Sequence, residues 1–210
     1  MLTLYDYVDA PSPRRARIFL AEKNASYKNV QIDLRAKEQL GEAYRKINPR
    51  CAVPCLEIED GQTISENIAI ATFLETAYPN PPLMGSTAIE KARVLEWNWR
   101  VEFEGLSAVA EILRNSSPHM KDRAMTGPRN VQQLPELVER GRTRLAHFFE
   151  DMNAQFSQSE NLAIDDYSFA DITALVTIDF SKWVKAAPSD DLTALWDWHK
   201  KAAARKASSA

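Results

Sequence analysis

The amino-acid sequence predicts an α/β domain followed by an all-helical domain. Three observations support this. Up to about Tyr78, short segments with strand-like alternation take turns with helical segments. The run Pro79-Asn80-Pro81-Pro82 cannot form regular structure, because proline lacks the backbone N–H that helices and sheets need. Beyond it, only helical periodicity remains. We therefore predict domains at residues 1–78 and 88–210, joined by a linker at 79–87.

In the first half, residues 2–5 alternate and are β-prone, which predicts a first strand. Ser12 before Pro13 is a helix-start signal, with Ser12 as N-cap and Pro13 at the first helical position. The remaining expected elements are a strand at 27–34, a helix at 38–47, strands at 54–58 and 62–64 around an Asp60-Gly61 turn, and a helix at 65–78. The order β-α-β-α-β-β-α, a parallel pair followed by an antiparallel hairpin, is typical of a thioredoxin-like domain.

The second half predicts a helical bundle. One long helix is expected at 87–115 and another at 131–156. Ser168 and Asp171 have the spacing of a capping box, which predicts the start of an apolar central helix. A last helix at 192–204 is expected to precede a frayed tail at 208–210.

Composition excludes several classes of function. The formal net charge is −3 and the pI about 5.7, which gives no electrostatic case for nucleic-acid binding. The basic trio Arg14, Arg15 and Arg17 is expected to solvate a helix face. No apolar run reaches the roughly 18 residues of a membrane span, and the N-terminus lacks signal-peptide features. The three histidines are far apart, so no metal site is expected. Cys51 and Cys55 are expected to be reduced, in a cytoplasmic protein.

Taken together and in order, several fragments resemble the glutathione transferase superfamily, particularly its bacterial cytosolic members. They are Leu4-Tyr5, Ser12-Pro13-Arg14-Arg15, Ile18 to Lys23, Ile47-Asn48-Pro49, Val53-Pro54, Asp60-Gly61, Ile64 to Ile70, Phe73-Leu74-Glu75, and the Ser168 to Asp171 box. The resemblance implies a detoxifying transferase that takes glutathione as co-substrate, without a metal, and conjugates its thiolate to a small electrophile. It also implies a homodimer in which the α/β half of one subunit packs on the helical half of the other.

The resemblance implies where glutathione binds. The bond between Val53 and Pro54 is expected to be cis, which presents the backbone of Val53 to the ligand as an edge strand would; the residues alone favour a trans proline at the start of an edge strand. Glu66 and Asn67 begin a helix, where a γ-glutamyl carboxylate is favoured and Glu66 can hold the ammonium group. The alternative is that Glu66 and Asn67 only complement the helix dipole. Arg50 is expected to meet the glycine carboxylate.

The group that stabilises the thiolate is less clearly marked. The positions where theta-like and omega-like relatives carry Ser or Cys fall on Ala10 and Pro11 here, whereas Ser12 matches a position occupied by Asn or Cys in other relatives. Ser12 is therefore the candidate donor to the thiolate, or else only a helix cap. Tyr7, after the first strand, is the runner-up; its alternative is a packed sheet tyrosine.

Other interpretations stay open at this stage. The protein could be a glutathione-dependent disulfide oxidoreductase or peroxidase, or a non-catalytic interaction module with the same fold. Cys51 is either inert or able to form a mixed disulfide with glutathione. The second substrate is expected between the domains, near Trp97, Trp99, Arg100 and Phe103, each of which could instead pack the helical core or a dimer interface.

Overall fold

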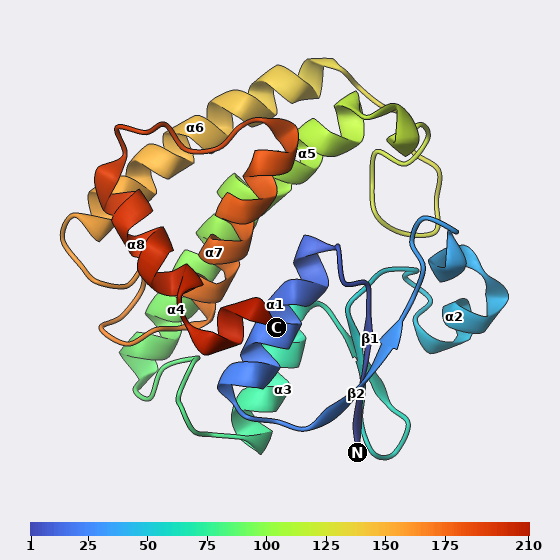
Figure 1. Ribbon diagram of the computed structural model, residues 1–210. Coiled ribbons are helices and arrows are strands. Elements are labelled where there is room, and N and C mark those ends of the chain that lie inside the picture. Colours follow the sequence, from blue (N-terminus) through green and yellow to red (C-terminus); the bar gives the residue numbers. More distant parts are fainter.

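The computed structural model describes all 210 residues and confirms the predicted fold class (Figure 1). The N-terminal domain has a four-stranded mixed sheet in the order β2-β1-β3-β4. Strand β1 is parallel to β2 and antiparallel to β3, which is paired antiparallel with β4. The elements of this domain are β1 (Leu2–Asp6), α1 (Pro11–Glu22), β2 (Tyr27–Gln31), the 3₁₀ turn η1 (Glu38–Leu40), α2 (Glu42–Ile47), β3 (Cys55–Glu57), β4 (Thr63–Ser65) and α3 (Asn67–Ala77).

Helices α1 and α3 pack together on the side of the sheet that faces the helical domain, and α2 lies on the other side (Figure 1). The predicted helix at 38–47 is interrupted at Gly41, which separates η1 from α2. The exact domain boundaries stay a prediction, although no helix or strand occurs between Ala77 and Ala88.

The start of α1 differs from the prediction. The helix begins at Pro11, and Ala10 is the extended N-cap, with φ −82° and ψ 137° and no side chain to cap the helix. The prediction of Ser12 as N-cap was wrong, because Pro11 has the fixed φ that suits a first helical position as well as Pro13 does. Ser12 therefore lies within the first turn, and its hydroxyl is free for other partners.

The C-terminal domain is helical throughout. Its elements are α4 (Ala88–Arg100), the π-helical turn η2 (Val101–Leu106), α5 (Ser107–Ser116), η3 (Pro118–Met120), α6 (Glu136–Phe156), α7 (Phe169–Ser181), η4 (Lys182–Val184), α8 (Thr193–Ala203) and η5 (Lys206–Ser209). The predicted helix at 87–115 is continuous, but η2 widens it by one turn between α4 and α5. Helix α6 begins five residues later than predicted. No helix combines the length and the apolar character that crossing a bilayer requires.

Helix α7 is the centre of this domain, and nearly all of its residues are buried. Its start is fixed by the predicted pair Ser168 and Asp171. The Asp171 carboxylate accepts from the Ser168 backbone N–H at 2.9 Å and from the Ser168 hydroxyl at 2.7 Å. It also accepts from the backbone N–H of Leu162 at 2.8 Å, which fastens the preceding loop. Burial raises the pKa of Asp171 to about 6, against the opposing effect of these hydrogen bonds.

The two domains share one hydrophobic core, with α1 packed against α7. Phe19 of α1 meets Phe169 of α7 edge to face, with ring centroids 5.6 Å apart. The C-terminal segment also joins them: Arg205 donates to the Glu22 carboxylate at 2.8 Å. The predicted frayed tail was wrong, because Ser208 is buried and its hydroxyl donates to the Ala202 carbonyl at 2.7 Å. The chain end is thus part of the domain contact.

The arginines of α1 were also predicted wrongly as a solvated face. Arg15 and Arg17 are buried and Arg14 is partly buried, and each meets a different carboxylate. Arg17 pairs with Asp6 of β1 at 2.6 Å, with both side chains nearly inaccessible. A pattern of basic residues cannot show that acidic side chains from other elements face them, so these pairs could not be predicted from the sequence.

Candidate functional site

Ser12 and Asn67, both predicted site residues, meet where α1 and α3 begin. The side-chain amide of Asn67 donates from Nδ2 to Ser12 Oγ at 2.9 Å. Asn67 is 5% exposed, and its Oδ1 has no hydrogen-bond partner in the protein. A buried amide oxygen without a donor is costly unless a ligand or solvent satisfies it. The contact therefore joins the two helix starts and leaves an acceptor ready for a ligand.

Both of these helices begin without a side-chain cap. Neither Ala10 before α1 nor Glu66 before α3 makes a side-chain capping hydrogen bond, and neither first turn contains an acidic residue. A helix start carries free N–H groups and roughly half a positive charge, which favours a bound anion. Because Asn67 and Ser12 are in contact, the two positive ends converge on one place. The site is suited to a thiolate or a carboxylate.

Glu66 is the N-cap residue of α3 and has an unusual backbone conformation. Its φ is 75° and its ψ 126°, in a region that side chains other than glycine rarely adopt. Such geometry costs on the order of 1–3 kcal/mol and is concentrated at functional sites. The Glu66 carboxylate is exposed and lies 3.3 Å from Nε of Arg50. The structure therefore brings Arg50 to Glu66, an arrangement that the sequence did not predict.

The segment before β3 carries the other predicted binding residues. The peptide bond between Val53 and Pro54 is cis, as the resemblance implied. The backbone N–H and C=O of Val53 make no hydrogen bond within the protein. The preceding residue is held firmly, since the Ala52 carbonyl accepts from the Tyr44 hydroxyl at 2.7 Å and from Asn48 Nδ2 at 2.8 Å. Val53 thus offers one donor and one acceptor from a fixed backbone.

Tyr7, the runner-up donor, follows β1 but has no hydrogen bond to Ser12 or Asn67. Partial desolvation raises the pKa of Tyr7, with Arg35 opposing the shift and Asp9 adding to it. A phenol whose pKa is raised is a poorer donor to a thiolate than one whose pKa is lowered. Of the two candidates, the structure connects only Ser12 to the other site residues.

The two cysteines are free thiols and both are buried. Burial raises the pKa of Cys55 to about 11, which keeps its thiol protonated near neutral pH. Cys51 Sγ lies 3.6 Å from the Pro49 carbonyl oxygen, to which it donates. A reactive cysteine is accessible to solvent, and neither of these thiols is.

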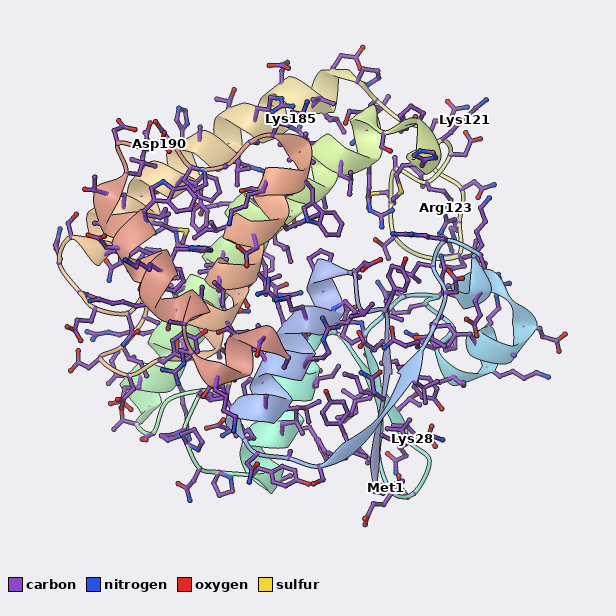
Figure 2. The ribbon with its side chains drawn as sticks, viewed as in Figure 1. Met1, Lys28, Lys121, Arg123, Lys185 and Asp190 are labelled. Carbon is purple, nitrogen blue, oxygen red and sulfur yellow. The ribbon has the colours of Figure 1, made fainter.

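A loop of the helical domain borders the site. Between η3 and α6 the chain reaches the N-terminal domain, where a Cβ added at Gly127 would lie 3.7 Å from the Arg50 carbonyl oxygen. The side chain of Arg123 reaches across this loop (Figure 2) and donates to the carbonyls of Gly127 at 2.6 Å and Arg129 at 3.2 Å. This loop could not be predicted as part of the site, because only the fold brings it to Arg50.

The residues expected near the second substrate lie in different surroundings. Trp99 and Phe103 are 67% and 51% exposed, and their rings stack with centroids 5.7 Å apart. Trp97 is partly buried, with the guanidinium of Arg100 4.6 Å from its ring centre. Arg100 is also paired with Asp151 at 2.7 Å. The four residues do not line one surface together.

Arg15 and Glu102 also border the site, although neither was predicted as a site residue. Arg15 Nη1 donates to Glu102 Oε1 at 2.7 Å, and Arg15 Nη2 lies 3.4 Å from Ser12 Oγ. Glu102 belongs to the π turn η2 of the helical domain. The pair is separated by 87 residues, so no local signal could have revealed it.

A thioredoxin-like domain followed by a helical domain, with two uncapped helix starts in contact and a cis proline before β3, is typical of glutathione transferase-like proteins. Residues 10–77 match the family described as "Glutathione S-transferase, N-terminal domain". The chain is 30% identical over 203 residues to Glutathione S-transferase 2 of Saccharomyces cerevisiae. The aligned region covers 95% of this chain and 84% of that protein. The chain belongs to the glutathione transferase superfamily.

Two further comparisons agree with this assignment. A glutathione S-transferase domain-containing protein of Marinobacter aquaeolei VT8 has the same fold, with a TM-score of 0.90 at 28% identity over 98% of both chains. Maleylacetoacetate isomerase of Pseudomonas aeruginosa is 34% identical over 94 residues, which is 44% of each chain. The second match is confined to less than half of the protein.

Proposed function

We propose that the protein is a glutathione transferase that holds glutathione as a thiolate and conjugates it to an electrophilic small molecule. The observation that carries the proposal is the contact between Ser12 and Asn67 at two uncapped helix starts. A free thiol with a pKa near 8.5 is mostly protonated at neutral pH. A hydroxyl donor and two positive helix ends lower that pKa, which raises the fraction of nucleophilic thiolate.

Ser12 is the proposed donor to the sulfur. Its oxygen already accepts the Asn67 amide, so its own hydrogen is available for an outside acceptor. In the conjugation step, the thiolate sulfur attacks the electrophilic carbon and forms a carbon–sulfur bond while the leaving group departs with its electron pair. The proton of the thiol has by then passed to solvent. Ser12 stabilises the charge and does not itself form a bond to the substrate.

The rest of glutathione is assigned to the flanking groups. Val53 is proposed to pair through its backbone N–H and C=O with the cysteinyl residue of the tripeptide, beside Pro54. The start of α3 and the free Asn67 Oδ1 suit the charged γ-glutamyl end. Arg50 contacts only one oxygen of Glu66, so Glu66 can receive the ammonium group on the other; releasing Arg50 also costs little, because the pair is exposed. Arg50 is then free for a carboxylate of the ligand.

The second substrate is proposed to lie between the domains, and its identity is left open. The match to maleylacetoacetate isomerase covers 44% of each chain, so it gives little guidance on the second substrate. A disulfide reaction that uses a cysteine of the protein is disfavoured, because both thiols are buried. A glutathione-dependent peroxidase or oxidoreductase that needs no protein thiol, and a non-catalytic module, are outcomes of the experiment below.

The experiment compares the wild type with Ser12→Ala and Tyr7→Phe. Calorimetry with glutathione measures binding, and assays with a halonitroaromatic electrophile and a glutathione-capped disulfide measure both reactions. We expect Ser12→Ala to lower the conjugation rate by about 10²-fold, as loss of one well-placed donor does, and Tyr7→Phe to change it less than twofold. Binding without any reaction would indicate a non-catalytic module. Absence of binding would overturn the proposal.

We further propose that the protein is cytoplasmic and forms a homodimer, as family members do. The exposed pair Trp99 and Phe103 on α4 and η2 would lose solvent exposure in such a contact. Sedimentation at micromolar concentration is expected to give about twice the mass of the chain. A single species with the mass of one chain would contradict the dimer without affecting the assignment of the site.

A further inference from the structure

A polar chain leads from Ser12 into the helical domain. Arg15 lies one turn after Ser12 in α1 and its side chain is 5% exposed. One end of its guanidinium, Nη2, is 3.4 Å from Ser12 Oγ, and the other, Nη1, is 2.7 Å from Glu102 Oε1. The cation thus bridges the proposed donor of one domain and a carboxylate of the other.

Glu102 is itself held in place by neighbours in the helical domain. Its Oε1 accepts from Asn98 Nδ2 at 3.1 Å. The hydroxyl of Thr173, on α7, donates to Asn98 Oδ1 at 2.7 Å. Asn98 and Thr173 are buried. The π turn that carries Glu102 is a departure from regular helix of the kind found often at functional sites.

These contacts decide what the Ser12 hydroxyl can do. Its oxygen has two acceptor positions and one hydrogen. Asn67 Nδ2, at 2.9 Å, occupies one acceptor position, and Arg15 Nη2, at 3.4 Å, faces the other. The hydrogen must then point away from both donors. A neighbouring cation also polarises the O–H bond and makes it a stronger donor.

We propose that Arg15 is a positioning residue that keeps the Ser12 hydroxyl turned toward the glutathione sulfur, and that Glu102 holds Arg15 in that place. The helical domain thereby contributes to thiolate formation in the other domain, in addition to any contact with the second substrate. This inference rests on the proposed role of Ser12. Its alternative is that the pair of Arg15 and Glu102 only fastens the domains together.

The structure provides a matched control for that alternative. Arg14 also joins α1 to the helical domain, through Asp179 of α7, at the same distance of 2.7 Å. Asp179 is further bound by His199 and Lys182, both at 2.9 Å. No hydrogen bond links either Arg14 or Asp179 to Ser12. Asp179→Asn therefore weakens a domain contact without altering the surroundings of the hydroxyl.

The test measures the pKa of glutathione bound to the wild type, Ser12→Ala, Arg15→Met, Glu102→Gln and Asp179→Asn, from the ultraviolet absorbance of the thiolate. The pH profile of kcat/KM is measured on the same proteins. Glu102→Gln removes the carboxylate charge that holds the Arg15 guanidinium in place, with little change in side-chain volume. We expect Arg15→Met and Glu102→Gln to raise the thiol pKa by about half a unit to one unit, since a charge within hydrogen-bonding distance commonly shifts a pKa by 1–3 units and this one acts indirectly. Glutathione KM should change less than twofold.

Three outcomes would be decisive. If Asp179→Asn raises the thiol pKa as much as Glu102→Gln does, the ion pair only fastens the domains and the inference is wrong. If Ser12→Ala raises the thiol pKa but Arg15→Met and Glu102→Gln do not, Ser12 keeps its role and the inference alone is overturned. If Ser12→Ala leaves the thiol pKa unchanged, the proposed role of Ser12 fails, and the inference fails with it. Thermal melting of each variant identifies any that does not fold.

Discussion

The buried ion pair between Arg17 and Asp6 supports a sharp prediction about stability. Asp6 is fully buried, and Arg17 Nη1 lies 2.6 Å from its Oδ1. The other oxygen of Asp6 accepts from Asn29 Nδ2 at 3.0 Å and from Gln31 Nε2 at 2.9 Å. Arg17 also donates to the Val8 carbonyl at 3.1 Å. The pair thus fixes α1 to both parallel strands and shapes the turn that leads to Ser12.

Replacing Arg17 with Met keeps the unbranched apolar stem of the side chain but leaves the Asp6 carboxylate without its cation. Breaking a buried pair from one side costs about 3–5 kcal/mol. The two amide donors that remain on Asp6 place the expected loss toward the lower end, at about 3–4 kcal/mol. For a protein of this length, each kcal/mol lowers the melting temperature by roughly 2–4 °C, so a fall of roughly 6–16 °C is expected.

Circular dichroism during urea and thermal unfolding measures this loss. The double variant Asp6→Asn with Arg17→Met removes both charges, so it should be more stable than Arg17→Met by at least about 1 kcal/mol, as coupled neighbours show in a double-mutant cycle. A loss below about 1 kcal/mol for Arg17→Met, or a double variant no more stable than the single one, would refute the reasoning. Either result would mean that the pair contributes nothing beyond the packing of its side chains.

Three further predictions about stability can be tested by the same unfolding measurements. Phe169→Ala should lower the free energy of unfolding by about 3–5 kcal/mol, because it removes the contact with Phe19. Phe169→Leu should lower it far less, and equal losses would contradict a packing role. Asp171→Asn should lose about 1–3 kcal/mol, because an amide cannot accept from Leu162 and Ser168 together; an unchanged urea midpoint would refute this. Burial of Asp179 raises its pKa, but hydrogen bonds from His199, Arg14 and Lys182 outweigh this effect and lower the pKa. The stabilisation by Asp179 is therefore present above about pH 4 and lost at lower pH. The stability difference between wild type and Asp179→Asn should therefore shrink on acidification, and a constant difference would refute the assignment.

Most of the fold could be predicted from short-range sequence patterns. The alternation at Leu2 and Leu4, the turn at Asp60-Gly61 and the pair Ser168 and Asp171 each depend on neighbours within a few residues, and each prediction was confirmed. One error occurred where two local solutions are equally good. Two prolines around Ser12 permit two helix starts, and the structure uses the first.

The site was predictable only in part, and for a physical reason. Val53 and Asn67 could be named as candidates because each stands in a short motif that the family resemblance rests on, before a strand or at a helix start. The contact of Asn67 with Ser12 spans 55 residues, and that of Arg15 with Glu102 spans 87. Such contacts depend on how helices are placed in space, which single-residue patterns do not contain. The π turn is equally invisible, because its residues have ordinary helical character.

The three arginines of α1 explain why the proposed site needs both domains. Arg17 is neutralised within the N-terminal domain by Asp6, but Arg15 and Arg14 find their carboxylates only on Glu102 and Asp179 of the helical domain. A buried guanidinium without a partner is strongly unfavourable, so an N-terminal half on its own would have to expose Arg15 to water. Turning Arg15 outward would remove its contact with the hydroxyl of Ser12. The helical domain therefore completes the surroundings of the proposed thiolate donor.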